Sequence, residues 1–108
     1  MGKYQDVVEA YAELIRETPA YQKYAERRDQ LKADPELYQK VLEFRHENFQ
    51  IQSETPEDQM MDRLEEFERK YESLRANPAV DRFLSAELAF CRMMQEVSVQ
   101  VMECLDFE

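Results

Sequence analysis

The longest hydrophobic pattern of the chain lies in its last third, residues 77–108. Apolar side chains recur there at steps of three and four, which is the spacing of one side of an α-helix. These positions are Phe83, Leu84, Leu88, Phe90, Cys91, Met94, Val97, Val101, Cys104 and Leu105. No glycine occurs in the stretch, and no proline follows Pro78. The pattern predicts a helix over 78–105, about 28 residues and roughly 42 Å long at 1.5 Å per residue.

Four prolines divide the remainder of the chain. Each follows a residue that can cap a helix: Thr18-Pro19, Asp34-Pro35, Thr55-Pro56 and Asn77-Pro78. Proline suits the first helical position because no N–H is needed there, and the preceding Thr, Asp or Asn can accept a hydrogen bond from free backbone N–H groups. Proline also moves the residue before it out of the α region, which ends the previous helix. The junctions therefore predict five helices, at about 3–17, 19–33, 35–52, 56–76 and 78–105.

The first three predicted helices each carry apolar residues for a core. The helix over 3–17 has Tyr4, Val7, Val8, Tyr11, Leu14 and Ile15. The helix over 19–33 has Tyr21, Tyr24, Ala25 and Leu31. The helix over 35–52 has Leu37, Tyr38, Val41, Leu42, Phe44 and Phe49, and the polar residues 50–54 are expected to form a link.

The predicted fourth helix has a coiled-coil spacing. Its apolar residues follow steps of four, three, four and three; they are Met60, Leu64, Phe67, Tyr71 and Leu74. An antiparallel hairpin of 56–76 with 78–105 follows from this seam, although a strongly kinked continuation at Asn77-Pro78 is the alternative. The expected fold is all-α, a single oligomeric domain over 1–108 with five helices and a long hairpin of the fourth and fifth.

Composition and charge restrict the function. The 108 residues carry a formal net charge of −10, which argues against direct binding of nucleic acid and against docking on an anionic membrane. The sequence shows no charged-then-apolar leader and no apolar run of about 18 residues, so we expect a cytoplasmic protein that does not span a membrane. Its two cysteines are expected to be reduced.

Candidate chemical groups are few. Glu43 and His46 have the Glu-x-x-His spacing of helical di-iron sites, but such a site needs two copies of the motif and the chain has one histidine. His46 is expected to be half-exposed on its helix. A single histidine and a single glycine leave no catalytic set and no phosphate-binding loop to assemble. We therefore expect no enzyme activity, no cofactor and no metal site within this chain.

The two cysteines lie on the same predicted helix. Cys91 and Cys104 are separated by about 20 Å along the axis and about 140° around it, so they cannot bridge each other or share one metal within that helix. Buried structural cysteines are the default interpretation. Cys104 is the better candidate for a ligand shared with another subunit.

The apolar surface of the last helix is wider than the ~100° that a single packing partner covers. One line of residues comprises Leu84, Leu88, Cys91, Met94, Ser98, Val101 and Leu105. A second line comprises Phe83, Ala86, Phe90, Met93, Val97 and Cys104. The excess predicts self-association, most simply as a two-fold dimer along this helix. The interface candidates are Phe83, Leu84, Glu87, Leu88, Phe90, Met94, Val97 and Val101.

Glu87 is unusual among these candidates because it is charged and lies between apolar positions. A carboxylate in such surroundings is costly unless it is paired. Either it forms a salt bridge with an arginine such as Arg28 or Arg45, or it fixes the register of a subunit interface.

Several of these junction motifs together resemble a known family. The ordered set is Thr18-Pro19-Ala20-Tyr21-Gln22-Lys23-Tyr24, Leu31 with Asp34-Pro35-Glu36-Leu37, and Asn77-Pro78 followed by Phe83-Leu84-Ser85-Ala86-Glu87. From about Val7 to Val101 the chain resembles the YlbF/YmcA family of small helical bacterial proteins. The resemblance implies a five-helix fold with a long hairpin, oligomers, and regulation of competence, sporulation and biofilm formation through a complex that acts with ribonuclease Y on transcript processing.

These observations favour a non-enzymatic helical oligomer that acts as a regulatory adaptor through protein–protein contacts. Its expected partners are further copies of itself, related helical regulatory proteins and the ribonuclease Y machinery. Some members of the resembled family carry iron–sulfur clusters on C-terminal cysteines. The alternative is therefore an iron–sulfur or redox-sensing regulatory subunit that uses Cys104 together with cysteines of a partner.

Overall fold

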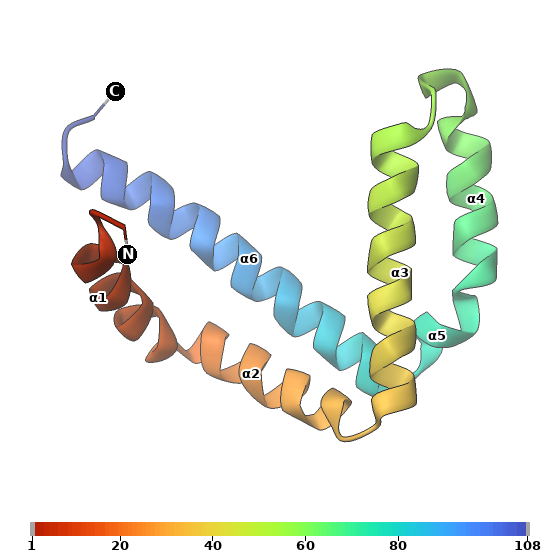
Figure 1. Cartoon of the computed structure of the whole chain (residues 1–108), viewed down its shortest axis with the longest axis horizontal. Coiled ribbons are helices and arrows are strands. Elements are labelled where there is room, and N and C mark those ends of the chain that lie inside the picture. Colours follow the sequence, from red (N-terminus) through yellow and green to blue (C-terminus); the bar gives the residue numbers. More distant parts are fainter. Residues whose placement is uncertain (1, 108) are drawn as a thin grey trace. The chain divides into compact units, whose positions relative to one another are not determined.

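The computed structural model describes residues 2–107 and contains only helices and their connections over that range. The elements are α1 (Gln5–Arg16), α2 (Pro19–Lys32), α3 (Pro35–Glu54), the 3₁₀ turn η1 (Glu57–Gln59), α4 (Met60–Lys70), α5 (Glu72–Ala76) and α6 (Pro78–Cys104). The all-α prediction is confirmed. The helices form two compact units (Figure 1): unit 1 comprises 2–28 and 83–107, and unit 2 comprises Asp29–Arg82. The predicted single domain over 1–108 stays a prediction, and residues 1 and 108 lie outside the described range.

Three of the four proline junctions cap helices as predicted. The Thr18 hydroxyl accepts a hydrogen bond from the Tyr21 N–H at 3.3 Å. At the start of α3, Asp34 Oδ1 accepts from the Leu37 N–H at 3.2 Å, and at the start of α6, Asn77 Oδ1 accepts from the Ala79 N–H at 2.9 Å. Each cap supplies an acceptor to an N–H group that has no partner within its helix.

The fourth junction differs, and the predicted helix over 56–76 is wrong as one continuous helix. Pro56 has an extended ψ of 146°, so only the turn η1 follows it, and α4 begins at Met60. A second break falls at Tyr71, whose φ of −106° and ψ of 14° lie outside the α region and separate α4 from α5. The Tyr71 ring packs edge-on against Phe44 at this break, with the ring centroids 5.2 Å apart.

In unit 1, α1 and α2 follow one another along α6 (Figure 1). Aromatic rings join α2 to α6: Tyr24 lies 5.8 Å from Phe83, and Tyr21 lies 5.5 Å from Phe90 between ring centroids. Because the residue numbers fall along α2 as they rise along α6, the two helices run antiparallel. The core of this unit contains Ile15 of α1 together with Phe83 and Ala86 of α6.

In unit 2, α3 and α4 form an antiparallel hairpin (Figure 1). The predicted inward positions of the fourth helix do face a neighbour, because Phe67 is buried and stacks on Phe44 of α3 at 5.1 Å between centroids. The spacing therefore identified the correct side of α4, but the hairpin partner that the structure shows for it is α3. The expected hairpin of 56–76 with 78–105 is not shown.

The predicted core of α3 needs two corrections. The expected polar link over 50–54 belongs to the helix, because Ile51 is 3% exposed and α3 continues to Glu54. Phe49, expected to be available to the core, is instead 71% exposed. Burial of Ile51 in place of Phe49 follows from the position of α4, which covers the side of α3 that carries Val41, Phe44 and Ile51.

Candidate interaction surfaces

The inner face of α6 is the line of apolar residues that packs within unit 1. Phe83 and Ala86 are buried, and Phe90, Met93 and Val97 are half-buried. Phe90 also stacks on Tyr24 with the ring centroids 5.4 Å apart. The second line of the last helix is therefore a core surface as far as Val97, and its Phe83 and Phe90 pack on α2 within unit 1.

A second apolar line on α6 is open to solvent. We call Leu88, Cys91, Val99 and Met102 the outer stripe; at 100° per residue they lie within one sector of the helix, centred about 160° from the inner face. Leu88 is 51% exposed, Val99 is 58% exposed and Met102 is 46% exposed. Leu84, half-buried, begins this line one turn before Leu88. The double apolar pattern therefore corresponds to one covered side and one open side.

Both cysteines are exposed, which makes their default interpretation as buried structural residues wrong. Cys91 follows Phe90 directly, and the 100° step between them turns its thiol out of the inner face into the outer stripe. Cys104 is the last residue of α6. Neither cysteine belongs to a group of three or more potential metal ligands among the described residues.

The start of unit 1 carries further exposed apolar residues. In α1, Ile15 is buried and Tyr11 is half-buried, whereas Val7, Val8 and Leu14 are each at least 60% exposed. Tyr4, just before α1, is 70% exposed. The predicted apolar stripe of this helix therefore contributes only its C-terminal part to the core.

The predicted interface residues divide between the two sides of α6. Phe83 is 1% exposed and packs on Tyr24, so it is not accessible on the surface of the folded chain. Leu84, Glu87, Phe90, Met94 and Val97 are half-buried. Leu88 and Val101 are exposed. The predicted interface candidates did not include two exposed residues of α6, Val99 and Met102. Continuing the steps of three and four from Leu88 along the helix reaches Met102.

Glu87 is half-buried on α6, and its side chain or backbone interacts with another group of the described chain. The arginine partner and the register role remain predictions.

Unit 2 contains a polar cluster formed by Glu47 of α3, Lys70 of α4 and Tyr71 at the helix break. Lys70 Nζ donates to Glu47 Oε1 at 2.9 Å. Hydrogen bonding by the Tyr71 hydroxyl and then by Lys70 lowers the pKa of the Glu47 carboxyl. The same hydrogen bond to Glu47 raises the pKa of Lys70. Burial, followed by the hydrogen bond to Glu47, raises the pKa of the Tyr71 phenol. The cluster ties α3 to the C-terminal end of α4.

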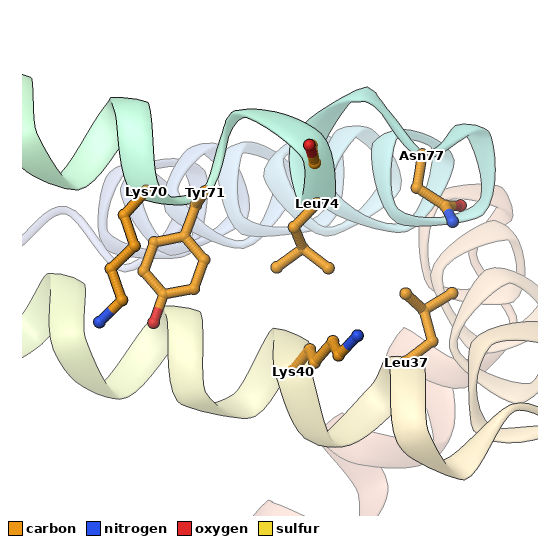
Figure 2. A pocket seen from close by; sticks show the side chains of 7 residues that line it. Leu37, Lys40, Lys70, Tyr71, Leu74 and Asn77 are labelled. Carbon is orange, nitrogen blue, oxygen red and sulfur yellow. The ribbon is translucent and has the colours of Figure 1, made fainter.

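Next to this cluster lies a cleft of about 340 Å³ (Figure 2). Its walls come from α3, the end of α4, the break at Tyr71 and α5 with the residue after it. The lining residues are Leu37, Lys40, Lys70, Tyr71, Ser73, Leu74 and Asn77. Tyr71 separates α4 from α5, and the residues on both sides of this break line the cleft. No sequence pattern predicted the break.

The positions considered for metal chemistry are both on the surface. Glu43 and His46 of α3 are exposed, so the expectation of a half-exposed histidine underestimates its accessibility. No group of three or more histidine, cysteine or acidic side chains within residues 2–107 is arranged to hold a metal ion. None of the described helices is both long enough and apolar enough to cross a membrane.

The fold and its open apolar side define an all-helical protein built around a long helix with one covered and one exposed face. The chain belongs to the family described as control of competence regulator ComK, YlbF/YmcA, whose model matches residues 4–106. The family expected from the junction motifs is thus confirmed.

Named relatives agree with this assignment. A UPF0342 protein of Desulfitobacterium hafniense is 28% identical over 102 residues, covering 93% of this chain and 82% of the relative. UPF0342 proteins of Caldicellulosiruptor saccharolyticus and Caldicellulosiruptor bescii are each 17% identical over 110 residues, covering 100% of this chain and 92% of the relative. No solved structure gives a significant match.

Proposed function

We propose that this protein is a non-enzymatic regulatory adaptor that self-associates through the outer stripe of α6. The supporting observation is the uneven distribution of exposed apolar side chains. Of the thirteen large exposed apolar residues in the described chain, ten belong to unit 1 and only three to unit 2. Exposed apolar residues scattered singly need no explanation, but a concentration on one pair of elements indicates an association surface.

The outer stripe is the part of this apolar surface that follows one side of α6. Its residues Leu88, Val99 and Met102 are each at least 46% exposed. A two-fold dimer is the simplest arrangement, because it places the same stripe of both copies in one contact.

Membership of the family extends the proposal to the kind of process. The family description names control of the competence regulator ComK. We accordingly propose a role in regulating bacterial development and transcript processing, with related helical regulatory proteins and the ribonuclease Y machinery as partners. A cytoplasmic location is part of this proposal.

The direct test is the molecular mass of three proteins by light scattering at about 10 µM, a concentration at which a biologically useful dimer is populated. We expect the unmodified chain to be a dimer or larger and Leu88→Asp to have a lower mass, because a carboxylate would be placed in apolar contact. Ala89→Asp is the matched control, because it introduces the same charge at an exposed position. Ala89 lies 100° from Leu88, on the polar side of α6. A strictly monomeric unmodified chain would contradict the proposal.

A second substitution separates association from folding. Val97 is half-buried on the inner face, so Val97→Asp should destabilise unit 1 and reduce the helical circular dichroism signal. Leu88→Asp should leave that signal unchanged, because Leu88 is 51% exposed in the folded chain. If Leu88→Asp unfolded the protein, the outer stripe would be part of the core.

A further inference from the structure

The cleft beside Tyr71 is basic and apolar within an acidic unit. Unit 2 contains eight Lys and Arg residues and fourteen Asp and Glu residues, a formal charge of −6. Nevertheless, two lysines and no carboxylate line the cleft. The charge of the cleft is thus opposite to that of the unit around it, which favours a negatively charged ligand over a positively charged one.

The two lysines of the cleft are not equivalent. Lys70 is already paired with Glu47. Lys40 has no hydrogen bond or ion pair with another described residue, and Figure 2 shows its side chain along the α3 wall with the ammonium nitrogen directed toward Leu37. Lys40 is thus the cation available to an incoming ligand.

The remaining lining residues define the rest of the ligand. The Asn77 carbonyl oxygen is used by the Ala79 N–H, which leaves the amide NH₂ group as a donor at the far end of the cleft. Leu37 and Leu74 face each other across it (Figure 2) and supply apolar surface. A volume of about 340 Å³ accommodates one or two side chains. This set fits a carboxylate carried beside an apolar side chain.

The chain itself displays such a group in the turn that ends α6. The Phe107 N–H donates to the Met102 carbonyl at 3.0 Å and the Asp106 N–H donates to the Glu103 carbonyl at 3.0 Å, which is the Schellman arrangement of a helix C-terminus. The backbone of the turn is therefore a defined structure. Leu105 is 69% exposed and Phe107 is 68% exposed, and Asp106, also exposed, is the residue between them in the sequence.

Asp106 occupies the left-handed position of this turn. Its φ is 52°, and it is the only non-glycine residue with positive φ among those described. Aspartate adopts this conformation more readily than most residues with a Cβ, because its short polar side chain can hydrogen-bond locally. Asp106 therefore suits the position that ends the helix while adding a carboxylate to the turn.

We propose that the Lys40 cleft of one copy binds the Leu105–Phe107 turn of a second copy, with Asp106 facing Lys40 and an apolar side chain between Leu37 and Leu74. The two surfaces are opposite in charge and alike in having an apolar part. Because they are different patches, the contact is head-to-tail and links copies into rings or chains. It is independent of the outer stripe and does not rest on the proposed function.

The test uses the full chain with the substitution Leu88→Asp, which is expected to remove self-association through the outer stripe. Sedimentation velocity at several hundred micromolar should show residual self-association that 0.5 M salt weakens, since charges carry part of it. Lys40→Glu and Asp106→Lys should each weaken this association about tenfold or more. A chain carrying both changes exchanges the two charges and should recover most of the lost affinity.

Two controls keep the outcome decisive. Lys23→Glu makes the same charge change at an exposed α2 residue outside the cleft, and it should leave the association unchanged. Asp106→Asn removes the charge while tolerating the left-handed conformation, so it should weaken the contact without loss of helical signal. A monomeric Leu88→Asp chain, equal effects of Lys40→Glu and Lys23→Glu, or no recovery in the charge exchange would each overturn the proposal. If Leu88→Asp does not lower the mass at about 10 µM, the outer-stripe proposal fails, and the charge exchange still tests this one.

Discussion

At the scale of single residues, Glu47 shows how the fold changes an ionisation equilibrium. Its carboxylate accepts hydrogen bonds in the folded state, and these lower its pKa below the ordinary value of 4.5. A lowered pKa means that the folded state binds the proton less readily than the unfolded state. Glu47 therefore stabilises the fold at pH values above about 4.5, and this contribution disappears as the pH falls through the lower folded pKa.

This sign gives a prediction for Glu47→Gln. The variant should be less stable than the unmodified chain near neutral pH, and the difference should close as the pH is lowered from about 6 to about 3. Thermal unfolding followed by circular dichroism measures both curves. Glu43→Gln, at an exposed position on the same helix, removes the same charge and should show a smaller difference. A gap between Glu47→Gln and the unmodified chain that stays constant with pH would contradict the assignment.

At the scale of elements, the aromatic cluster holds the α3–α4 hairpin together. Phe67 is 6% exposed and lies 5.1 Å from Phe44 and 5.0 Å from Tyr71 between ring centroids. Offset and edge-on ring contacts add to the free energy gained by burying the rings. The cluster is therefore a buried apolar contact between α3 and the end of α4.

We predict that Phe67→Ala lowers the free energy of unfolding by about 3–5 kcal/mol, the usual cost of removing a buried aromatic ring. Phe49→Ala is the control, because Phe49 of α3 is 71% exposed and its replacement should change stability by less than about 0.5 kcal/mol. Urea denaturation measures both. Similar losses in the two variants would mean that Phe49 is covered by a contact outside the described chain.

The sequence predicts where most helices begin but not which helices meet. Asp34, Asn77 and Thr18 act through neighbours three positions away or closer, so local chemistry was enough to place their caps. The spacing that contains Phe67 and Tyr71 identifies a side of a helix, and any helix with a complementary side could have covered it. The break at Tyr71 lies where its ring packs on Phe44 of α3, a separate element, and no local pattern indicated it.

The same distinction applies to the surfaces. The double pattern of α6 correctly indicated more apolar area than one neighbour covers, and Leu88 was identified as part of it. Exposure of Cys91 could not be read from the spacing, because a residue adjacent to Phe90 becomes buried or exposed according to where α2 lies. The cleft with Lys40 combines residues of three helices and carries no sequence motif.

At the scale of the whole molecule, the outer stripe makes Cys91 a reporter of self-association. In a Cys104→Ser chain, Cys91 is the remaining thiol. Its reaction with a maleimide should slow several-fold as the protein concentration rises from about 0.1 µM to about 100 µM, because the dimer covers the stripe. In a Leu88→Asp chain the rate should not depend on concentration. A constant rate while the mass of the unmodified chain rises would place the interface elsewhere.

The division into two units also has a consequence for how the chain acquires its fold. Unit 2 is one continuous segment, Asp29–Arg82, so its hairpin closes through contacts between residues near each other in sequence, which form quickly. Unit 1 joins the beginning of the chain to residues 83–107 and must wait until the last third has been synthesised. During that interval Tyr21 and Tyr24 lack the rings of Phe83 and Phe90 that pack on them in the finished protein. We therefore expect the side of α2 that carries these rings to stay uncovered until α6 is complete.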